Sequence, residues 1–192
     1  MTHYVNMQVT HIFLAHAKNS LESMVPFNDK SGFPPEELYQ NAIWGTGMIV
    51  SCVGAVESYV NIIFDSHTEY LWYDSLRLNE KIEALCQLHG CKIDKSRDPY
   101  QTFLQIVGIR NWLMHFKREV IGLMGAEGSW VTNSDRIKKP NMDPLKIFTQ
   151  QQCRRYYDCT RNMVELLGKA VHLDNIEYDF VKNEQYDPFL IG

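Results

Sequence analysis

The feature that most constrains the fold is a long apolar segment that runs from Ile43 to Phe64. About 20 such residues in a helix can span a bilayer. The segment nevertheless carries Glu57, Ser58 and Asn61, whose polar groups would be costly in lipid. A helix that is apolar on most of its surface is equally what the centre of a helical bundle needs. We therefore expect a core helix and not a membrane span.

Four further segments repeat apolar residues at helical spacing, over about residues 8–25, 76–88, 100–118 and 147–172. Pro34 and Pro35 stand where the core helix would begin. Asp98 is a plausible cap, and Pro99 a plausible first position, of the helix over 100–118. The sequence has no internal repeat and no alternating strand pattern. It therefore predicts an all-α fold, a helical bundle of about five helices.

The chain of 192 residues is long enough for one domain, 1–192, with a sizeable core. Glycines and prolines indicate a long loop over 120–145, and an acidic, aromatic tail over 173–192 has no assigned structure. The net charge of -4 argues against coating nucleic acid by bulk charge, so any such contact must be local. The start lacks the pattern of a signal peptide. We expect a cytoplasmic protein that contacts no membrane.

Metal and cofactor sites find little support in the sequence. The five cysteines are odd in number and form no CxxC pair, which suits reduced thiols without disulfides. Cys86, His89 and Cys91 are close together, but no second cluster completes a four-ligand zinc site. His11 and His16 would lie about 140° apart around a helix, poorly placed to share a metal. We expect neither a metal nor a cofactor.

The segment RNWLMHF, residues 110–116, combines Arg110, Asn111 and His115. Asn111 and His115 are four apart and share a helix face, toward which the long side chain of Arg110 can bend. A guanidinium can hold a phosphate, and an imidazole can move a proton near neutral pH. Together they suffice to cleave RNA through its own 2'-hydroxyl without a metal. Alternatively, His115 is a hydrogen-bonded bundle residue and Arg110 an exposed charge.

In the order and pattern of its helices, the segment 37–172 resembles the HEPN superfamily (higher eukaryotes and prokaryotes nucleotide-binding). Its members are small helical bundles whose early helix carries an acidic residue and an asparagine four apart, here Glu57 and Asn61. A later helix carries an Arg-x4-6-His motif, here Arg110 and His115. The residue after the arginine is often polar, as it is here.

This resemblance implies a metal-independent endoribonuclease of toxin or host-defence type, in which two protomers bring their Arg-His motifs together. Arg110 would contact the scissile phosphate and His115 would transfer a proton, leaving a cyclic-phosphate end. Asn111 would position one of them or the RNA, while Glu57 would orient Arg110 or be a buried ion-pair partner. Members paired with a nucleotidyltransferase antitoxin typically carry a tyrosine where Lys117 stands. That departure puts this partnership in doubt and leaves the identity of any antitoxin or regulatory partner open.

Five basic residues could form a local rim that binds RNA, although solvated helix faces explain them equally well: Lys117, Arg118, Arg154, Arg155 and Arg161. Several HEPN families are inactive as nucleases and serve as binding or regulatory modules. A non-catalytic helical dimer is therefore the alternative. A third hypothesis is an enzyme of small-molecule metabolism, but the sequence carries no cofactor motif.

Overall fold

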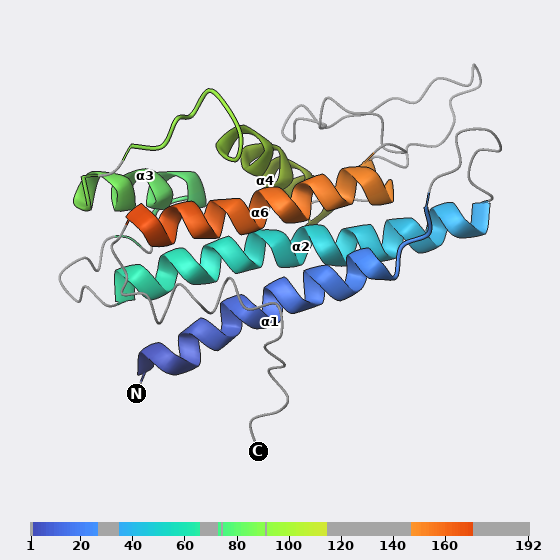
Figure 1. Cartoon of the computed structure of the whole chain (residues 1–192), viewed down its shortest axis with the longest axis horizontal. Coiled ribbons are helices and arrows are strands. Elements are labelled where there is room, and N and C mark those ends of the chain that lie inside the picture. Colours follow the sequence, from blue (N-terminus) through green and yellow to red (C-terminus); the bar gives the residue numbers. More distant parts are fainter. Residues whose placement is uncertain are drawn as a thin grey trace.

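A computed structural model of the chain describes residues 2–26, 35–65, 73, 75–90, 92–114 and 147–170. In this part the chain forms helices and no strand, which confirms the predicted all-α class and the bundle of about five helices. With the labels of Figure 1, the helices are α1 (Thr2–Glu22), α2 (Pro35–Asp65), α3 (Leu78–Leu88), α4 (Tyr100–Met114) and α6 (Gln150–Ala170). The predicted loop 120–145 and tail 173–192 lie outside the described residues.

The α2 helix is the centre of the bundle, as the apolar segment predicts. It packs on α1, α3, α4 and α6, and Figure 1 shows it lying between α1 and α6. The stretch Tyr39–Asp65 is long and apolar enough to cross a bilayer, with a mean hydropathy of 1.6. However, 67% of its most apolar window is buried inside the protein. Its apolar surface is therefore covered by other helices of the same chain.

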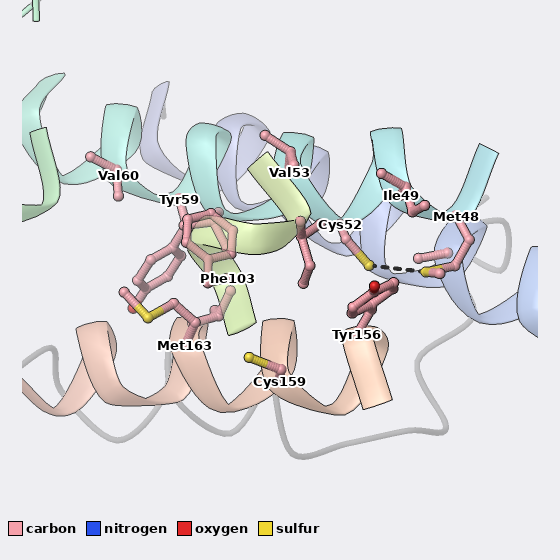
Figure 2. Packing of buried hydrophobic residues seen from close by; sticks show 14 of the residues in the cluster. Met48, Ile49, Cys52, Val53, Tyr59, Val60, Phe103, Tyr156, Cys159 and Met163 are labelled. Carbon is pink, nitrogen blue, oxygen red and sulfur yellow. Dashed lines mark hydrogen bonds between the residues drawn. The ribbon is translucent and has the colours of Figure 1, made fainter. Parts of the chain in front are cut away.

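The core forms where α2 faces α4 and α6. Met48, Cys52 and Tyr59 of α2 are buried there, and Figure 2 shows this row opposite Phe103 of α4 and Met163 of α6. Removing this apolar surface from water contributes roughly 25 cal/mol for each Å² buried. This packing fixes the position of α4, the helix that carries Arg110.

Polar contacts set the register of α1 along α2. The Thr10 and Ser58 hydroxyls are 2.9 Å apart, and His16 Nδ1 lies 2.8 Å from Ser51 Oγ. Just after α1, the side chain of Asn41 accepts a hydrogen bond from the Val25 backbone N–H and donates one to the Val25 backbone carbonyl. His16 thus has a structural partner, in keeping with its interpretation as a residue at the edge of the core.

The helix boundaries differ from the prediction at some ends. The α1 helix begins at Thr2 instead of residue 8, because an existing helix gains one hydrogen bond for each residue added. It ends at Glu22, shortly before Pro26, whose ring disfavours helical backbone in the preceding residue. The α3 helix begins two residues later than predicted, where the Glu80 carboxylate accepts a hydrogen bond from the Arg77 backbone N–H at 2.7 Å.

Asp98 caps the start of α4 from one position further out than predicted, because the helix begins at Tyr100 and not at Pro99. Asp98 Oδ1 accepts hydrogen bonds from the backbone N–H of Thr102 at 3.2 Å and from its hydroxyl at 2.5 Å. A carboxylate there satisfies a backbone donor that the first helical turn leaves without a partner. Pro99 directly precedes the first helical residue, Tyr100. Residues 115–118, predicted as the end of this helix, lie outside the described residues.

Candidate functional site

Three polar side chains, Glu57, Asn61 and Asp65, follow one another at four-residue spacing along α2. Residues four apart share one helix face, and we call this set the polar stripe. Each member bonds a different segment: Glu57 bonds α4, Asn61 bonds α3, and Asp65 accepts a hydrogen bond from Tyr73 Oη. The stripe therefore links the core helix to three separate parts of the fold.

The first member of the polar stripe meets the arginine of the Arg-His motif. Arg110 Nη2 lies 3.5 Å from Glu57 Oε2, across the interface between α4 and α2. The side chains are 26% and 44% exposed, respectively, so solvent reaches the pair. A guanidinium carries five N–H donors in a rigid fork. The contact with Glu57 restrains Arg110 and leaves donors for a further anionic group.

The second member of the polar stripe meets a buried lysine. Lys81 of α3 is 7% exposed, and its ammonium donates a hydrogen bond to Asn61 Oδ1 at 2.8 Å. The same ammonium lies 5.1 Å from the centre of the Tyr73 ring, within the range of a cation–π interaction. The Tyr73 ring stacks on Phe64. Aromatic packing and one amide oxygen therefore compensate for the burial of this charge.

Lys81 and Asp65 were missed by sequence reasoning. The signal for Asp65 was the four-residue spacing, which continues from Glu57 and Asn61. Lys81 gives no such signal, because lysine on an amphipathic helix is usually exposed and its partner comes from another helix.

The remaining members of the Arg-His motif are placed differently. Asn111 is exposed on the outer side of α4, whereas Arg110 reaches toward α2. Consecutive helical residues differ by about 100° around the axis, which explains the divergence. The structure therefore does not bring Asn111 to the Glu57–Arg110 pair. His115, Lys117 and Arg118 lie outside the described residues.

The arginines of α6 form no continuous rim with Arg110 in the described part of the chain. Arg155 donates hydrogen bonds to Asp98 Oδ2 at 3.2 Å and to Thr102 Oγ1 at 3.1 Å. Its interactions thus tie α6 to the start of α4. Bonds from the Thr102 hydroxyl and from Arg155 hold the pKa of Asp98 below its ordinary value.

The other two α6 arginines differ in exposure. Arg154 is exposed and lines a shallow groove with Asp98 and Asp158, whereas Arg161 is partly buried. Two carboxylates in this groove offset its positive charge. Arg155 lines the same groove and is also exposed.

Four described cysteines are buried and in no disulfide: Cys52, Cys86, Cys153 and Cys159. Burial raises the pKa of the Cys52 and Cys159 thiols to about 12 and raises that of Cys153 as well. A thiol is a nucleophile and a metal ligand only as its thiolate. Among the described residues, no three His, Cys, Asp or Glu side chains gather as a metal site would require. Cys91, the third member of the group with Cys86 and His89, lies outside them.

The contacts of the polar stripe therefore hold one partly exposed guanidinium, suited to an anion, close to an amide and a buried ammonium. Comparison with protein-family models, with curated proteins and with solved structures finds no match for the chain.

Proposed function

We propose that the protein is a cytoplasmic, metal-independent endoribonuclease of the HEPN type, with a role as a toxin or in host defence. The observation that carries this proposal is the contact between Glu57 and Arg110. The resemblance relates the acidic residue of an early helix to the arginine of a later one. In this fold the two residues, far apart in sequence, lie within 3.5 Å of each other.

The geometry of the pair suits catalysis at a phosphate. Arg110 is restrained by one carboxylate, so its fork keeps an orientation before a substrate arrives. Donors that are fixed where negative charge develops stabilise a transition state without reorganisation. Because both side chains are partly exposed, a phosphate can approach the remaining guanidinium donors. A fully buried pair would be sealed from the substrate.

The proposed reaction needs one anion-binding group and one group that moves protons. The RNA 2'-hydroxyl loses its proton and its oxygen bonds to phosphorus, while the bond from phosphorus to the 5'-oxygen breaks and that oxygen takes up a proton. The products are a 2',3'-cyclic phosphate and a 5'-hydroxyl. Arg110 binds the phosphate oxygens, and His115 serves in proton transfer. DNA lacks the 2'-hydroxyl and is not a substrate.

The outer face of α4 supports the pairing of two protomers. Gly108, Asn111 and Met114 follow at three-residue spacing and are exposed, Met114 to 62%. Among the described residues, a Cβ placed on Gly108 would meet no atom within 4 Å beyond the backbone of its own helix. This exposed surface of α4, which includes Asn111 of the motif, can receive a second copy of the helix around a two-fold axis. The proposed active form is therefore a homodimer whose motifs share one cleft.

The first experiment measures the cleavage of a mixed-sequence RNA in EDTA, next to a DNA of the same sequence. Wild type, Arg110→Ala and His115→Ala are compared with Arg97→Ala and His16→Ala, which change an arginine and a histidine outside the site. Arg97 is 77% exposed, and within the described ranges its ion-pair partner is nearby Asp94. We expect wild type and both controls to cut RNA and spare DNA. Loss of either site residue should lower the rate at least about 100-fold.

Two results would contradict the proposal. Equal cleavage by all five proteins would identify a contaminating nuclease. No cleavage by the folded wild type on any RNA tested would favour the alternative function, a non-catalytic helical binding module. Mass analysis of the RNA ends adds a further check, because a 3'-phosphate formed directly by water attack is incompatible with 2'-hydroxyl chemistry.

A further inference from the structure

We infer that Asn61 contacts the RNA through its amide N–H₂ group and that Lys81 is the positioning residue that holds this amide. The inference rests on the proposed function. It concerns the second member of the polar stripe, which lies next to the Glu57–Arg110 pair, and it adds a second contact for the substrate at the same site.

Lys81 determines which way the Asn61 amide faces. An ammonium has three donors and no acceptor, so only the amide oxygen can face it, and Lys81 Nζ indeed lies 2.8 Å from Asn61 Oδ1. The Nδ2 group must then point away from Lys81. In the described part of the chain, no residue accepts a hydrogen bond from this Nδ2. Asn61 is partly exposed, so its two donors are open to a ligand.

Apolar packing alone does not call for a charge at position 81. Lys81 extends among buried apolar residues, with Ile82 and Leu85 on the same helix fully buried. A buried charge costs desolvation energy that its contacts must repay, and apolar replacements of such groups are often neutral or stabilising. The residue is nevertheless a lysine, and its one described hydrogen bond goes to Asn61. Fixing the amide is a use for this charge that packing alone does not supply.

The spacing along α2 suits a single nucleotide. Asn61 lies four residues after Glu57, which corresponds to about 6 Å along the helix axis. A phosphate bound by Arg110 would therefore place its own second oxygen, or the adjoining ribose hydroxyls, near the Asn61 donors. Both are hydrogen-bond acceptors. The ligand of Asn61 is thus the sugar–phosphate backbone of the RNA and not a base.

Two substitutions test the roles of Asn61, the proposed donor, and Lys81, the residue that positions it, separately. Asn61→Asp keeps an oxygen for Lys81 and adds an attractive charge, but it removes both N–H donors. Lys81→Met keeps the apolar length of the side chain and removes the ammonium. Lys169→Met is the matched control, because it removes a lysine that bonds Glu165 on the outside of α6. For each protein, kcat and KM on a fluorescent mixed-sequence RNA and the melting temperature are measured.

We expect Asn61→Asp to raise KM about tenfold or more, the value of one hydrogen bond to a charged group. Lys81→Met should also raise KM, by a smaller factor, while the KM of Lys169→Met should stay within about twofold of the wild-type value. The melting temperatures should stay within about 3 °C of wild type, which corresponds to less than about 1 kcal/mol. An unchanged KM in Asn61→Asp would overturn the inference alone, because the wild type still cuts RNA. Inactivity of the folded wild type would overturn the proposed function together with it.

A purely structural role predicts the opposite pattern. If Lys81 and Asn61 only hold α3 on α2, activity should fall in step with the melting temperature, with KM unchanged. Asn61→Asp, which forms an ion pair with Lys81, should then be as active as wild type. This result would also overturn the inference.

Discussion

At the Glu57–Arg110 pair, the proposed role of Glu57 is to orient Arg110 and not to stabilise the fold. The pair meets at a single 3.5 Å contact with both side chains partly exposed, and such ion pairs contribute about 0–1 kcal/mol. We expect Glu57→Gln to change the free energy of unfolding by less than about 1 kcal/mol and to lower kcat/KM about tenfold, because a misplaced guanidinium binds the transition state less well. Denaturant unfolding and RNA cleavage measure the two effects.

The control for this prediction is Glu165→Gln. Glu165 is also a partly exposed carboxylate in an ion pair, with Lys169 on α6, but it has no described contact with the polar stripe. Its activity should equal that of wild type. A loss of stability in Glu57→Gln that accounts for the whole loss of activity would contradict the orienting role of Glu57.

The buried thiols should be unreactive in the folded protein. At pH 8, a thiol with a pKa of about 12, such as Cys52 or Cys159, holds roughly a thousandth of the thiolate of a thiol at the ordinary value of 9.0. We expect iodoacetamide to alkylate both about 1000-fold more slowly in the native state than in guanidinium chloride. Mass spectrometry of peptides after timed quenching measures this ratio. Rapid native labelling of Cys52 would show that the core opens often.

The residues of the polar stripe show which contacts a local sequence pattern can predict and which it cannot. The resemblance implied that Glu57 either orients Arg110 or forms a buried ion pair, and the two side chains meet at 3.5 Å. Lys81, the partner of Asn61, could not be predicted from the sequence. The two residues meet only when α3 packs on α2 in the tertiary structure, and lysine is rarely buried. Likewise, the sequence grouped Asn111 with Arg110, whereas the turn of the helix separates their side chains.

At the scale of elements, periodicity located the helices better than it located their ends. The α2 helix was predictable because a segment that is apolar on most sides needs partners all around it, and α1, α4 and α6 supply them. The start of α4 was predictable from the capping chemistry of Asp98. The start of α1 was not, because helix propagation through its first residues leaves little trace in the apolar pattern.

Two glycines of α2 offer a matched test of how closely it packs. A Cβ on Gly45 would lie 2.6 Å from Phe148 Cδ1, whereas one on Gly47 would lie at an ordinary 3.5 Å from its nearest neighbours. Alanine gains about 1 kcal/mol over glycine within a helix, while overpacking costs about 1–3 kcal/mol. We expect Gly47→Ala to be stabilising and to exceed Gly45→Ala by about 1–3 kcal/mol in the free energy of unfolding.

Urea denaturation of the two variants and wild type measures this difference. Both substitutions add the same methyl group to the same helix, so they share the gain in helix propensity. Equal stability of the two variants would show that α6 and the turn at Phe148 shift at no cost. The position of α2 in the bundle would then be less strictly defined than the close approach at Gly45 implies.

In the whole molecule, the arrangement of charge favours α4 over α6 as the place where an anion binds. Arg155 is occupied with Asp98 and Thr102, and carboxylates accompany Arg154 in its groove. A basic rim could not be judged from the sequence, since the residues that neutralise it come from other helices. The outer face of α4 carries Gly108, Asn111 and Met114, none of which is charged.

The dimer proposed for this face gives the sharpest prediction for the whole molecule. Gly108→Gln adds a side chain at a position where no neighbouring atom of the described residues lies within 4 Å of a Cβ, and it should raise helix stability by up to about 1 kcal/mol. Across a two-fold axis the same side chain would meet its own copy and separate the two α4 helices. We therefore expect a protomer that is at least as stable as wild type, elutes as a monomer in light-scattering chromatography and cleaves RNA at least about tenfold more slowly. Full activity in a monomeric Gly108→Gln protein would show that one protomer carries a complete site. A variant that stays dimeric would place the interface elsewhere on the bundle.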